Sequence, residues 1–269
     1  MTMQPQHDTE CLNAGDPRAA HRARKPLKEL VQRARDPEWV ADTALRFVAY
    51  GWDRVSPSEF SSLYRRIRTR TMCSNARLRG LYHGVRDVVK NEIPGDLVEC
   101  GTALGGSAAL MALTLRQLEA RRTLWVFDTF EGLPAPTRAD PDFEVANLYA
   151  GSCVGTLEEV QSLFTQLQVR DRVQFVKGLF QDTLPAVGIS QIAVLHIDGD
   201  WYESVKTCLD HLYDKVAPGG IIQFDDYGYW EGARKAVDEF LEARGIRASL
   251  KKLDYSGRIL VKPLSSSEP

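Results

Sequence analysis

The apolar residues of the first third of the chain recur at helical spacing. The pattern begins near Pro26 and ends near Lys90. We therefore predict a helical cap or lid over residues 26–90, packed in front of the core. Residues 1–25 are polar and hold too little apolar surface to order themselves, so we interpret them as a flexible tail, and residues 264–269 as a second, short tail.

After Pro94, short apolar runs alternate with stretches of helical periodicity. The strand-like runs are Leu97–Cys100, Leu124–Phe127, Val173–Val176, Ile192–Ile197 and Ile221–Phe224. The helical stretches that separate most of them are Ser107–Glu119, Glu203–Lys215 and Gly232–Ala243. Such alternation predicts an α/β domain over residues 91–263, with a mainly parallel sheet covered by helices on both faces.

The end of this domain has a different pattern. Ala248–Leu253 and Arg258–Val261 flank the turn Asp254–Gly257, which predicts an antiparallel hairpin. With the earlier runs, the hairpin completes a seven-stranded sheet. A Rossmann-like, mainly parallel sheet that ends in an antiparallel hairpin is the arrangement of class I methyltransferases, although the parallel part alone fits many dehydrogenases equally well.

Composition and charge are those of an ordinary globular protein. Of 269 residues, 43% are hydrophobic and 26% are charged, and the formal net charge is −2. This balance gives no reason to expect nucleic-acid or membrane binding. The five cysteines form no Cys-x-x-Cys pair, the N-terminus has no apolar signal core, and no run approaches the ~18 apolar residues of a membrane span. We therefore expect a cytoplasmic location.

One segment departs from this even distribution of charge. Between residues 65 and 79, six arginines follow one another without an intervening acid. They form either a solvated helix face or a patch that meets an anionic ligand.

Two acidic clusters follow runs that we interpret as buried strands. The first is His196-Ile-Asp198-Gly-Asp200 and the second ends in Asp225-Asp226. The carboxyl ends of strands in an open α/β sheet meet at the ligand-binding edge. Crowded carboxylates repel one another unless a cation or shared protons offset the charge, and oxygen-only ligands suit Mg²⁺. We favour a metal site; the alternative is that these aspartates cap the following helices or turns.

A glycine-rich turn connects the first strand to the next helix. It runs from Glu99 through Gly101 to Gly105-Gly106-Ser107. Glycine lets the backbone approach a ligand, and the helix N-terminus offers unpaired N–H groups to a carboxylate or phosphate. The spacing differs from the dinucleotide pattern Gly-x-Gly-x-x-Gly, and Glu99 would accept an ammonium group but repel a pyrophosphate. S-adenosylmethionine carries an ammonium and a carboxylate, so we expect it as the cofactor.

The polar residues after the next two strands complete the predicted cofactor site. Asp128 ends the second strand and is placed to accept hydrogen bonds from ribose hydroxyls, with Glu131 as a substitute and a turn-opening role as the alternative. After the third strand, Gln181 and Asp182 are candidates for binding an adenine edge, although Asp182 could instead cap the next helix.

Over about residues 65–245 the chain resembles the TylF, or macrocin, O-methyltransferase family. The matching motifs are Thr71-Met72, Arg77–Tyr82, Ile93–Gly101, Gly105–Ser107, Phe127–Pro134, His196–Ser204 and Pro218–Tyr227. The resemblance implies a metal-dependent transferase that uses S-adenosylmethionine to methylate sugar hydroxyls, and that assembles as a homodimer or higher homo-oligomer. The expected acceptor is a sugar, commonly a deoxysugar, on a glycosylated natural product or a nucleotide-sugar.

Carried over by position, the resemblance makes Asp198, Asp225 and Asp226 the metal ligands and Asp200 the general base. It places cofactor contacts at Thr71, Met72, Glu99, Gly101, Ser107, Asp128 and Asp182. The metal would orient two adjacent hydroxyls and lower the pKa of one, and Asp200 would remove its proton. The chain departs from the family inside the glycine turn, where Ala103 and Leu104 replace an aromatic and a basic residue.

Three alternatives remain open at this point. A catechol-type methyltransferase would use the same fold, cofactor and metal on a planar aromatic diol. A nicotinamide-dependent oxidoreductase would share the sheet, but Glu99 and the glycine spacing argue against it. A non-catalytic binding module could keep the fold, but the complete set of acids argues against that.

Overall fold

The computed structural model describes residues 36–264 and contains a mixed sheet of seven strands. The strands are β1 (Asp96–Cys100), β2 (Leu124–Asp128), β3 (Val173–Lys177), β4 (Ile192–Ile197), β5 (Val216–Phe224), β6 (Lys251–Lys252) and β7 (Arg258–Val261). Their order across the sheet is β3-β2-β1-β4-β5-β7-β6. Strands β1 to β5 pair in parallel, and β7 pairs antiparallel with both β5 and β6. The predicted α/β fold with its C-terminal hairpin is confirmed.

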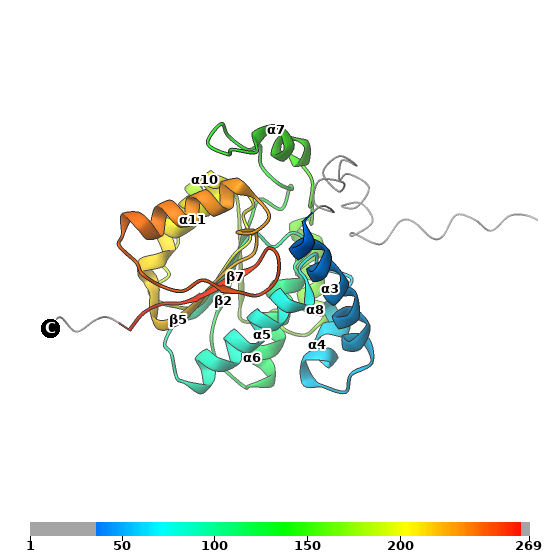
Figure 1. Ribbon diagram of the computed structural model, residues 1–269. Helices are drawn as coiled ribbons and strands as arrows, with labels where there is room; N and C mark the ends of the chain where they lie inside the picture. Colours follow the sequence, from blue (N-terminus) through cyan, green and yellow to red (C-terminus); the bar gives the residue numbers. More distant parts are fainter. Residues whose placement is uncertain (1–35, 265–269) are drawn as a thin grey trace, which may run out of the picture.

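Helices cover both faces of this sheet (Figure 1). One face carries α4 (Glu59–Ile67), α5 (Asn75–Lys90), α6 (Gly106–Gln117) and α8 (Leu157–Gln166), and the other carries α9 (Phe180–Thr183), α10 (Tyr202–Leu212) and α11 (Glu231–Ala243). Helix α3 (Pro37–Val55) packs on α4 and α5. The shorter elements are α7 (Phe143–Ala146) and the 3₁₀ turns Asn147–Tyr149, Leu184–Ala186 and Tyr213–Lys215.

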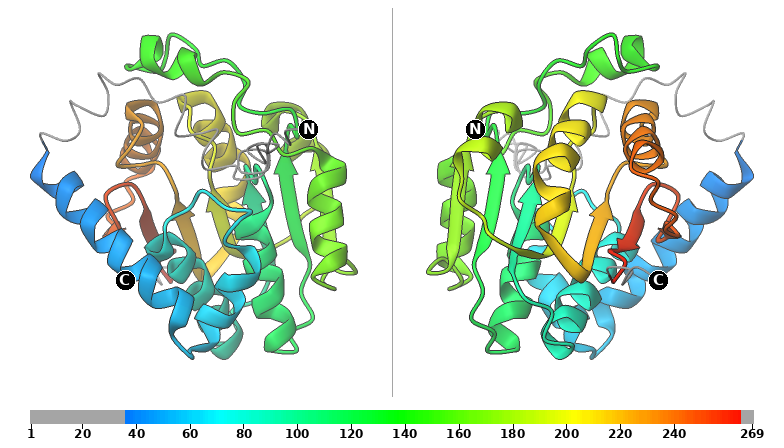
Figure 2. Two further views of the ribbon diagram at one scale, coloured as in Figure 1. Left: turned by 90° about the vertical axis from the view of Figure 1, so that its right-hand side faces the viewer. Right: turned by 90° about the vertical axis from the view of Figure 1, so that its left-hand side faces the viewer.

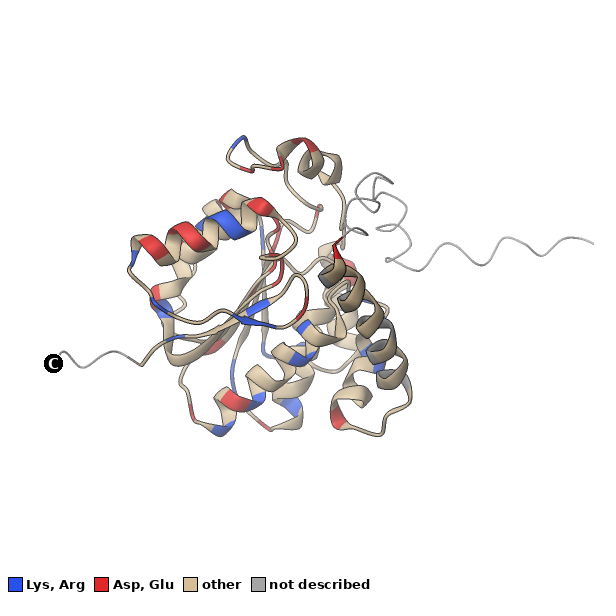
Figure 3. Ribbon diagram, in the orientation of Figure 1, with Lys and Arg blue, Asp and Glu red and all other residues tan. Residues whose placement is uncertain are grey.

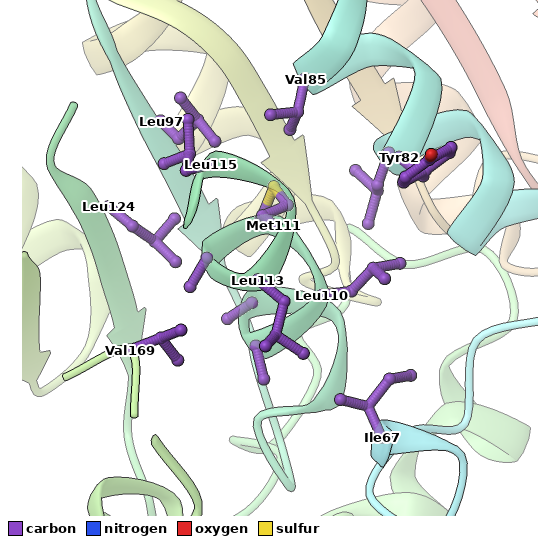
Figure 4. Packing of buried hydrophobic residues seen from close by; sticks show 14 of the residues in the cluster. Ile67, Tyr82, Val85, Leu97, Leu110, Met111, Leu113, Leu115, Leu124 and Val169 are labelled. Atoms are coloured by element: carbon purple, nitrogen blue, oxygen red, sulfur yellow. The ribbon is translucent and has the colours of Figure 1, made fainter. Parts of the chain in front are cut away.

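Burial on both faces explains why the central strands are apolar throughout. All six residues of β4 are buried. Leu97 and Val194 face the layer of α5 and α6, whereas Val98 and Leu195 face α10 and α11. Figure 4 shows Met111 of α6 among the side chains of the first layer. Each such buried aliphatic side chain contributes about 1.5–3 kcal/mol, so these two layers fix the strand ends from which the loops emerge.

The strand boundaries differ from the sequence prediction in two places. Strand β5 begins at Val216, because a register shift against β4 lets the strand continue through Pro218-Gly219-Gly220. At the other end, the predicted strand 248–253 is reduced to Lys251–Lys252, the two residues that pair with β7. Neither difference moves the carboxyl ends of β4 and β5.

Helix α8 and the segment before it are absent from the sequence prediction. The helix has a capping box between Thr156 and Glu159, and its apolar residues Val160, Leu163 and Phe164 are buried. This Thr-x-x-Glu pattern is the signal that identifies it. The preceding residues 129–153, which include α7, rise beyond the carboxyl ends of the strands (Figure 2). We call residues 129–153 the cover segment.

The predicted domain boundaries are only partly within the described residues. The tail 1–25 lies outside them, as do residues 265–269 of the second tail. Within the predicted cap, α5 packs directly on α6, β4 and β5; the boundary near residue 90 stays a prediction.

Among the helices of residues 36–264, none is long and apolar enough to cross a membrane. Acidic and basic residues are intermixed along outer helices such as α11 (Figure 3).

Candidate active site

The loops after β1, β2, β3, β4 and β5 line a cavity of about 1230 Å³ at one edge of the sheet. The strand order reverses between β1 and β4, and ligands of open α/β sheets bind at such a switch point. The predicted site residues that line the cavity are Thr71, Met72, Gly101, Ser107, Asp128, Gln181, Asp198, Asp200, Asp225 and Asp226. Glu99 and Asp182 do not line it.

The glycine turn packs directly against two other loops of the site. Gly101 has φ +88°, and a Cβ there would lie 1.9 Å from the carbonyl oxygen of Asp198. A Cβ on Gly106 would lie 2.3 Å from the carbonyl oxygen of Arg70. These close approaches place Thr71-Met72 beside the N-terminus of α6 and the loop after β4 beside the turn. The two predicted glycine-rich and acidic motifs therefore meet.

Asp128 holds the glycine turn in shape. Its Oδ2 accepts hydrogen bonds from the N–H groups of Thr102 at 2.7 Å and Ala103 at 3.0 Å, and its Oδ1 accepts from Phe130 at 2.7 Å. Burial raises the pKa of Asp128, and the backbone donors act in the opposite direction. A carboxylate has lone pairs beyond those used by these three N–H groups, so Asp128 could still accept hydrogen bonds from ribose hydroxyls. This role stays a prediction.

The two candidates after β3 lie in different places. Gln181 is exposed at the cavity. Asp182 is also exposed, but it stands outside the lining, in the first turn of α9, where its N–H donates to the carbonyl of Leu179. Both adenine contacts stay predictions, with Gln181 in the better position.

Three aspartates form an acid cluster, which we define as Asp198, Asp200 and Asp226. One oxygen from each lies within 4.8 Å of the others. Burial raises the pKa of all three, and the charge of Asp226 raises the pKa of Asp198 and Asp200 further. Asp226 Oδ2 is buried without a hydrogen-bond partner among the described residues. A divalent cation would offset the repulsion and satisfy this oxygen, so the residues fit a hard metal such as Mg²⁺.

Asp225 differs from the acid cluster because positive or polar groups face its oxygens. Arg77 donates to Oδ2, and His196 Nε2 lies 3.3 Å from Oδ1. Cys73 Sγ lies 3.7 Å from Oδ1, and Cys73, Asp198 and Asp225 form a second group of potential ligand atoms within 4.8 Å. These contacts leave lone pairs on the Asp225 carboxylate with which it could bind a metal. Its role as a metal ligand stays a prediction. Cys73 has no signal in the sequence, because it lies far from every other cysteine.

A buried polar network extends from Asp225 at the cavity wall; its members are Glu99, His196, Asp225, Arg77 and Asp254. Glu99 Oε1 lies 2.9 Å from His196 Nδ1, and Arg77 Nε lies 3.1 Å from Asp254 Oδ2 in the hairpin turn. Glu99 is fully buried and also accepts a hydrogen bond from Thr102 Oγ1 at 2.6 Å. Its predicted role toward an ammonium group stays a prediction. The network joins β1, β4, β5, α5 and the hairpin.

The arginine-rich segment serves several purposes. Arg65 and Arg66 donate to backbone carbonyls, Arg79 lies 4.3 Å from the ring of Phe60, and Arg68 and Arg70 line the cavity. With Arg77 in the buried network, the segment is neither a single solvated face nor a single anion-binding patch.

The cover segment is anchored to the helices that follow the acidic motifs. Buried Asp140 accepts a hydrogen bond from the N–H of Tyr202 at 2.7 Å, at the start of α10. Trp201 Nε1 donates a hydrogen bond to the carbonyl of Pro134 at 2.8 Å. Asp142 accepts one from the N–H of Glu231, the first residue of α11. Residues 132–137 line the cavity from this side. Sequence periodicity does not reveal the segment, because most of it is irregular.

The strand order, the glycine turn after β1 and the acids after β4 and β5 together define a class I methyltransferase. The structure of the O-methyltransferase NovP matches with a TM-score of 0.69 and 36% identity, over 72% of this chain and 83% of that one. A calicheamicin methyltransferase, 21% identical, matches in fold with a TM-score of 0.58, over 84% of this chain and 93% of that one.

The family model "Macrocin-O-methyltransferase (TylF)" matches residues 63–262, and the chain belongs to this family. Demethyldecarbamoylnovobiocin O-methyltransferase of Streptomyces niveus is 38% identical, over 70% of this chain and 73% of that protein. A 4'-O-methyltransferase of a rhamnosyl tetracenomycin C from Streptomyces olivaceus is 35% identical over the same shares, and mycinamicin III 3''-O-methyltransferase of Micromonospora griseorubida is 34% identical over 70% and 76%. The protein is an S-adenosylmethionine-dependent O-methyltransferase, which excludes the oxidoreductase alternative.

Proposed function

We propose that this enzyme methylates a sugar hydroxyl of a glycosylated small molecule with the help of a divalent cation. The observation that carries the proposal is the single cavity that joins the glycine turn after β1 to the acids after β4 and β5. Donor and acceptor would meet in that enclosure. The rhamnosyl acceptor in the name of one relative supports a sugar as the methylated group.

Mg²⁺ is the cation that these residues fit best. Asp198 and Asp226 stand in the acid cluster, and the unpartnered Asp226 Oδ2 is a ready ligand. Asp225 is the third proposed ligand, next to its contacts with Arg77 and His196. When bound, Mg²⁺ would engage two adjacent hydroxyls of the sugar and lower the pKa of the reacting one.

The chain's own residues then have to align the partners and take a proton. Methyl transfer forms a bond from the hydroxyl oxygen to the methyl carbon and breaks the bond from that carbon to the sulfonium sulfur, which leaves S-adenosylhomocysteine. Asp200 lies in the acid cluster on the cavity wall and is the proposed acceptor of the hydroxyl proton. Burial raises its pKa, which makes it a stronger base than an exposed aspartate.

A catechol is the competing acceptor, because it also offers two adjacent hydroxyls. The acid cluster alone does not distinguish the two classes. The cavity is large enough for an acceptor bigger than a single catechol ring, and the cover segment adds Leu133, Pro134 and Pro136 to its lining. This apolar side favours an acceptor with a hydrophobic body attached to the sugar.

We also propose that the enzyme assembles as a homodimer or higher homo-oligomer. Helix α3 exposes the apolar residues Leu45, Val48, Trp52 and Val55 at helical spacing, and Trp52 is 64% exposed. Contiguous apolar surface of this kind is usually covered by another molecule. Light scattering of the full chain measures the mass directly.

The function is tested by methyl transfer to matched acceptors. Each acceptor pair consists of a glycoside and its aglycone, assayed with Mg²⁺, with EDTA, and with EDTA followed by excess Mg²⁺. We expect a methylated sugar only with the glycoside and only when Mg²⁺ is available. Mass spectrometry of the sugar fragment shows whether the methyl group is on the sugar. Methylation of an aglycone catechol would support the competing acceptor, and full turnover in EDTA would contradict the metal.

A further inference from the structure

We propose that Trp230 is a positioning residue for Asp200. This inference rests on the proposed function, in which Asp200 is the general base. The indole Nε1 of Trp230 donates a hydrogen bond to Asp200 Oδ1 at 2.9 Å. The bond fixes one carboxylate oxygen and leaves Oδ2 to receive the proton of the acceptor hydroxyl.

Asp200 needs a directional partner because, within residues 36–264, no other side chain donates a hydrogen bond to its carboxylate. Its backbone has φ +58°, a left-handed conformation that turns the chain sharply after β4. Asp226, a neighbour in the acid cluster, repels its carboxylate. An oriented carboxylate matters because proton transfer requires the base within hydrogen-bond reach of the proton it takes.

The kind of donor is as informative as its position. Asp225, a proposed metal ligand, is paired with the charged guanidinium of Arg77. Asp200 instead faces a neutral indole N–H. The indole therefore sets the direction of the Asp200 carboxylate without forming an ion pair with it. The difference in donor therefore follows the difference in the proposed roles.

Trp230 is itself held firmly enough to orient another residue. Its side chain is buried, with ring centroids of Tyr149, Trp201 and Tyr229 at 5.3, 5.0 and 5.0 Å. Its backbone N–H donates to the carbonyl of Asp226 at 3.0 Å. The indole cannot turn without disturbing the cover segment, which supplies Tyr149, and the loop after β5. Trp230 thus contacts the proposed base Asp200, the loop that carries Asp226 and the cover segment.

The test removes the N–H and keeps an aromatic ring. Trp230→Phe should lower kcat about tenfold or more, with the KM of the glycoside and the Kd values of S-adenosylhomocysteine and Mg²⁺ within about twofold. The matched control is Trp125→Phe, because Trp125 Nε1 donates to Asp96 Oδ2 at 3.0 Å at the opposite ends of β1 and β2. This control loses the same kind of bond and should keep kcat within about twofold.

A double-variant comparison separates positioning from packing. If Trp230 acts through Asp200, Trp230→Phe causes no further loss of kcat in an Asp200→Asn background. Equal fold losses in both backgrounds, or equal losses in Trp230→Phe and Trp125→Phe, overturn the inference. If Asp200→Asn has no measurable turnover, the comparison of the two tryptophan variants decides alone.

Two further outcomes keep this inference distinct from the proposed function. Full activity of Asp200→Asn refutes the base itself, whereas an inactive Asp200→Asn beside a fully active Trp230→Phe refutes only the role of Trp230. If Trp230→Phe does not fold, benzothienylalanine at position 230 replaces the N–H by sulfur at the same ring size. The same loss of kcat is then expected, and unchanged kcat overturns the inference.

Discussion

Two sets of acids lie near the same edge of the sheet and differ in their partners. In the buried polar network, Glu99 faces His196, and Asp225 and Asp254 face Arg77. In the acid cluster, Asp198, Asp200 and Asp226 face one another, and within residues 36–264 no salt bridge reaches them. The acids of the network are buried, whereas those of the acid cluster are half-buried at the cavity wall, so the two sets differ in exposure as well as in their partners.

This contrast indicates what each set contributes. A buried acid with a charged partner is stable as it stands, but removing the partner leaves an uncompensated charge. Buried acids that face one another raise each other's pKa and lower their repulsion only by taking up protons or a cation. We therefore expect the network mainly to maintain the fold, although its member Asp225 is also a proposed metal ligand, and we expect the acid cluster to serve binding and chemistry. Three substitutions test this division.

The largest effect is expected for activity in the acid cluster. Asp198→Asn should lower kcat by at least about 10²-fold, because the metal and the base contribute together to activating the hydroxyl. The Kd of S-adenosylhomocysteine, measured by titration calorimetry, should change little. Asp210→Asn, at an exposed salt bridge with Lys206, is the control and should keep full activity. Full turnover of Asp198→Asn would refute the proposed metal ligand.

The next effect concerns stability in the buried polar network. Arg77→Met removes the common partner of Asp225 and Asp254 and should lower the free energy of unfolding by about 3–5 kcal/mol, measured in urea. The matched change Arg86→Met removes an exposed pair with Glu59 and should cost about 0–1 kcal/mol. Equal losses in the two variants would contradict the division between the sets.

The smallest effect is a pH dependence in the metal-free protein. Burial raises the folded pKa of Asp226 above its ordinary value of 3.8, so its contribution to stability is present below that pH and is lost as the pH rises through the folded pKa. Relative to Asp226→Asn, the unaltered protein should lose about 1.4 kcal/mol per unit of raised pKa between acidic and neutral pH. Melting curves in EDTA measure the difference. If the stability of both proteins changes with pH in the same way, the pKa of Asp226 is not raised in the folded protein.

The sequence locates the acids better than it locates their partners. Asp198 and Asp226 are predictable because Asp198 directly follows one buried apolar strand, β4, and Asp226 is the second residue after another, β5. Glu99 is predictable as a strand-end acid, but its direction depends on the register of β1 against β4, which places Glu99 opposite His196. That register comes from packing between strands far apart in the chain.

Arg77 and Trp230 show why the remaining contacts escape a reading of the sequence. An arginine among apolar residues of a helix usually extends its charged end to water, so nothing in the local pattern indicates that Arg77 is buried. Trp230 follows the second acidic motif by a few residues, yet its partner Asp200 belongs to the first. Such pairs depend on how two loops fold over each other.

The missing side chain at Gly101 makes the glycine turn and the loop that carries the acids Asp198 and Asp200 share one wall. Because any larger residue there would displace the backbone of Asp198, the two cannot be altered independently. An engineer who transplants a different cofactor turn into this scaffold therefore has to transplant the loop after β4 with it. Specificity for the acceptor, by contrast, can be redesigned at Leu133, Pro134 and Pro136 of the cover segment, which line the cavity, without a change at Gly101.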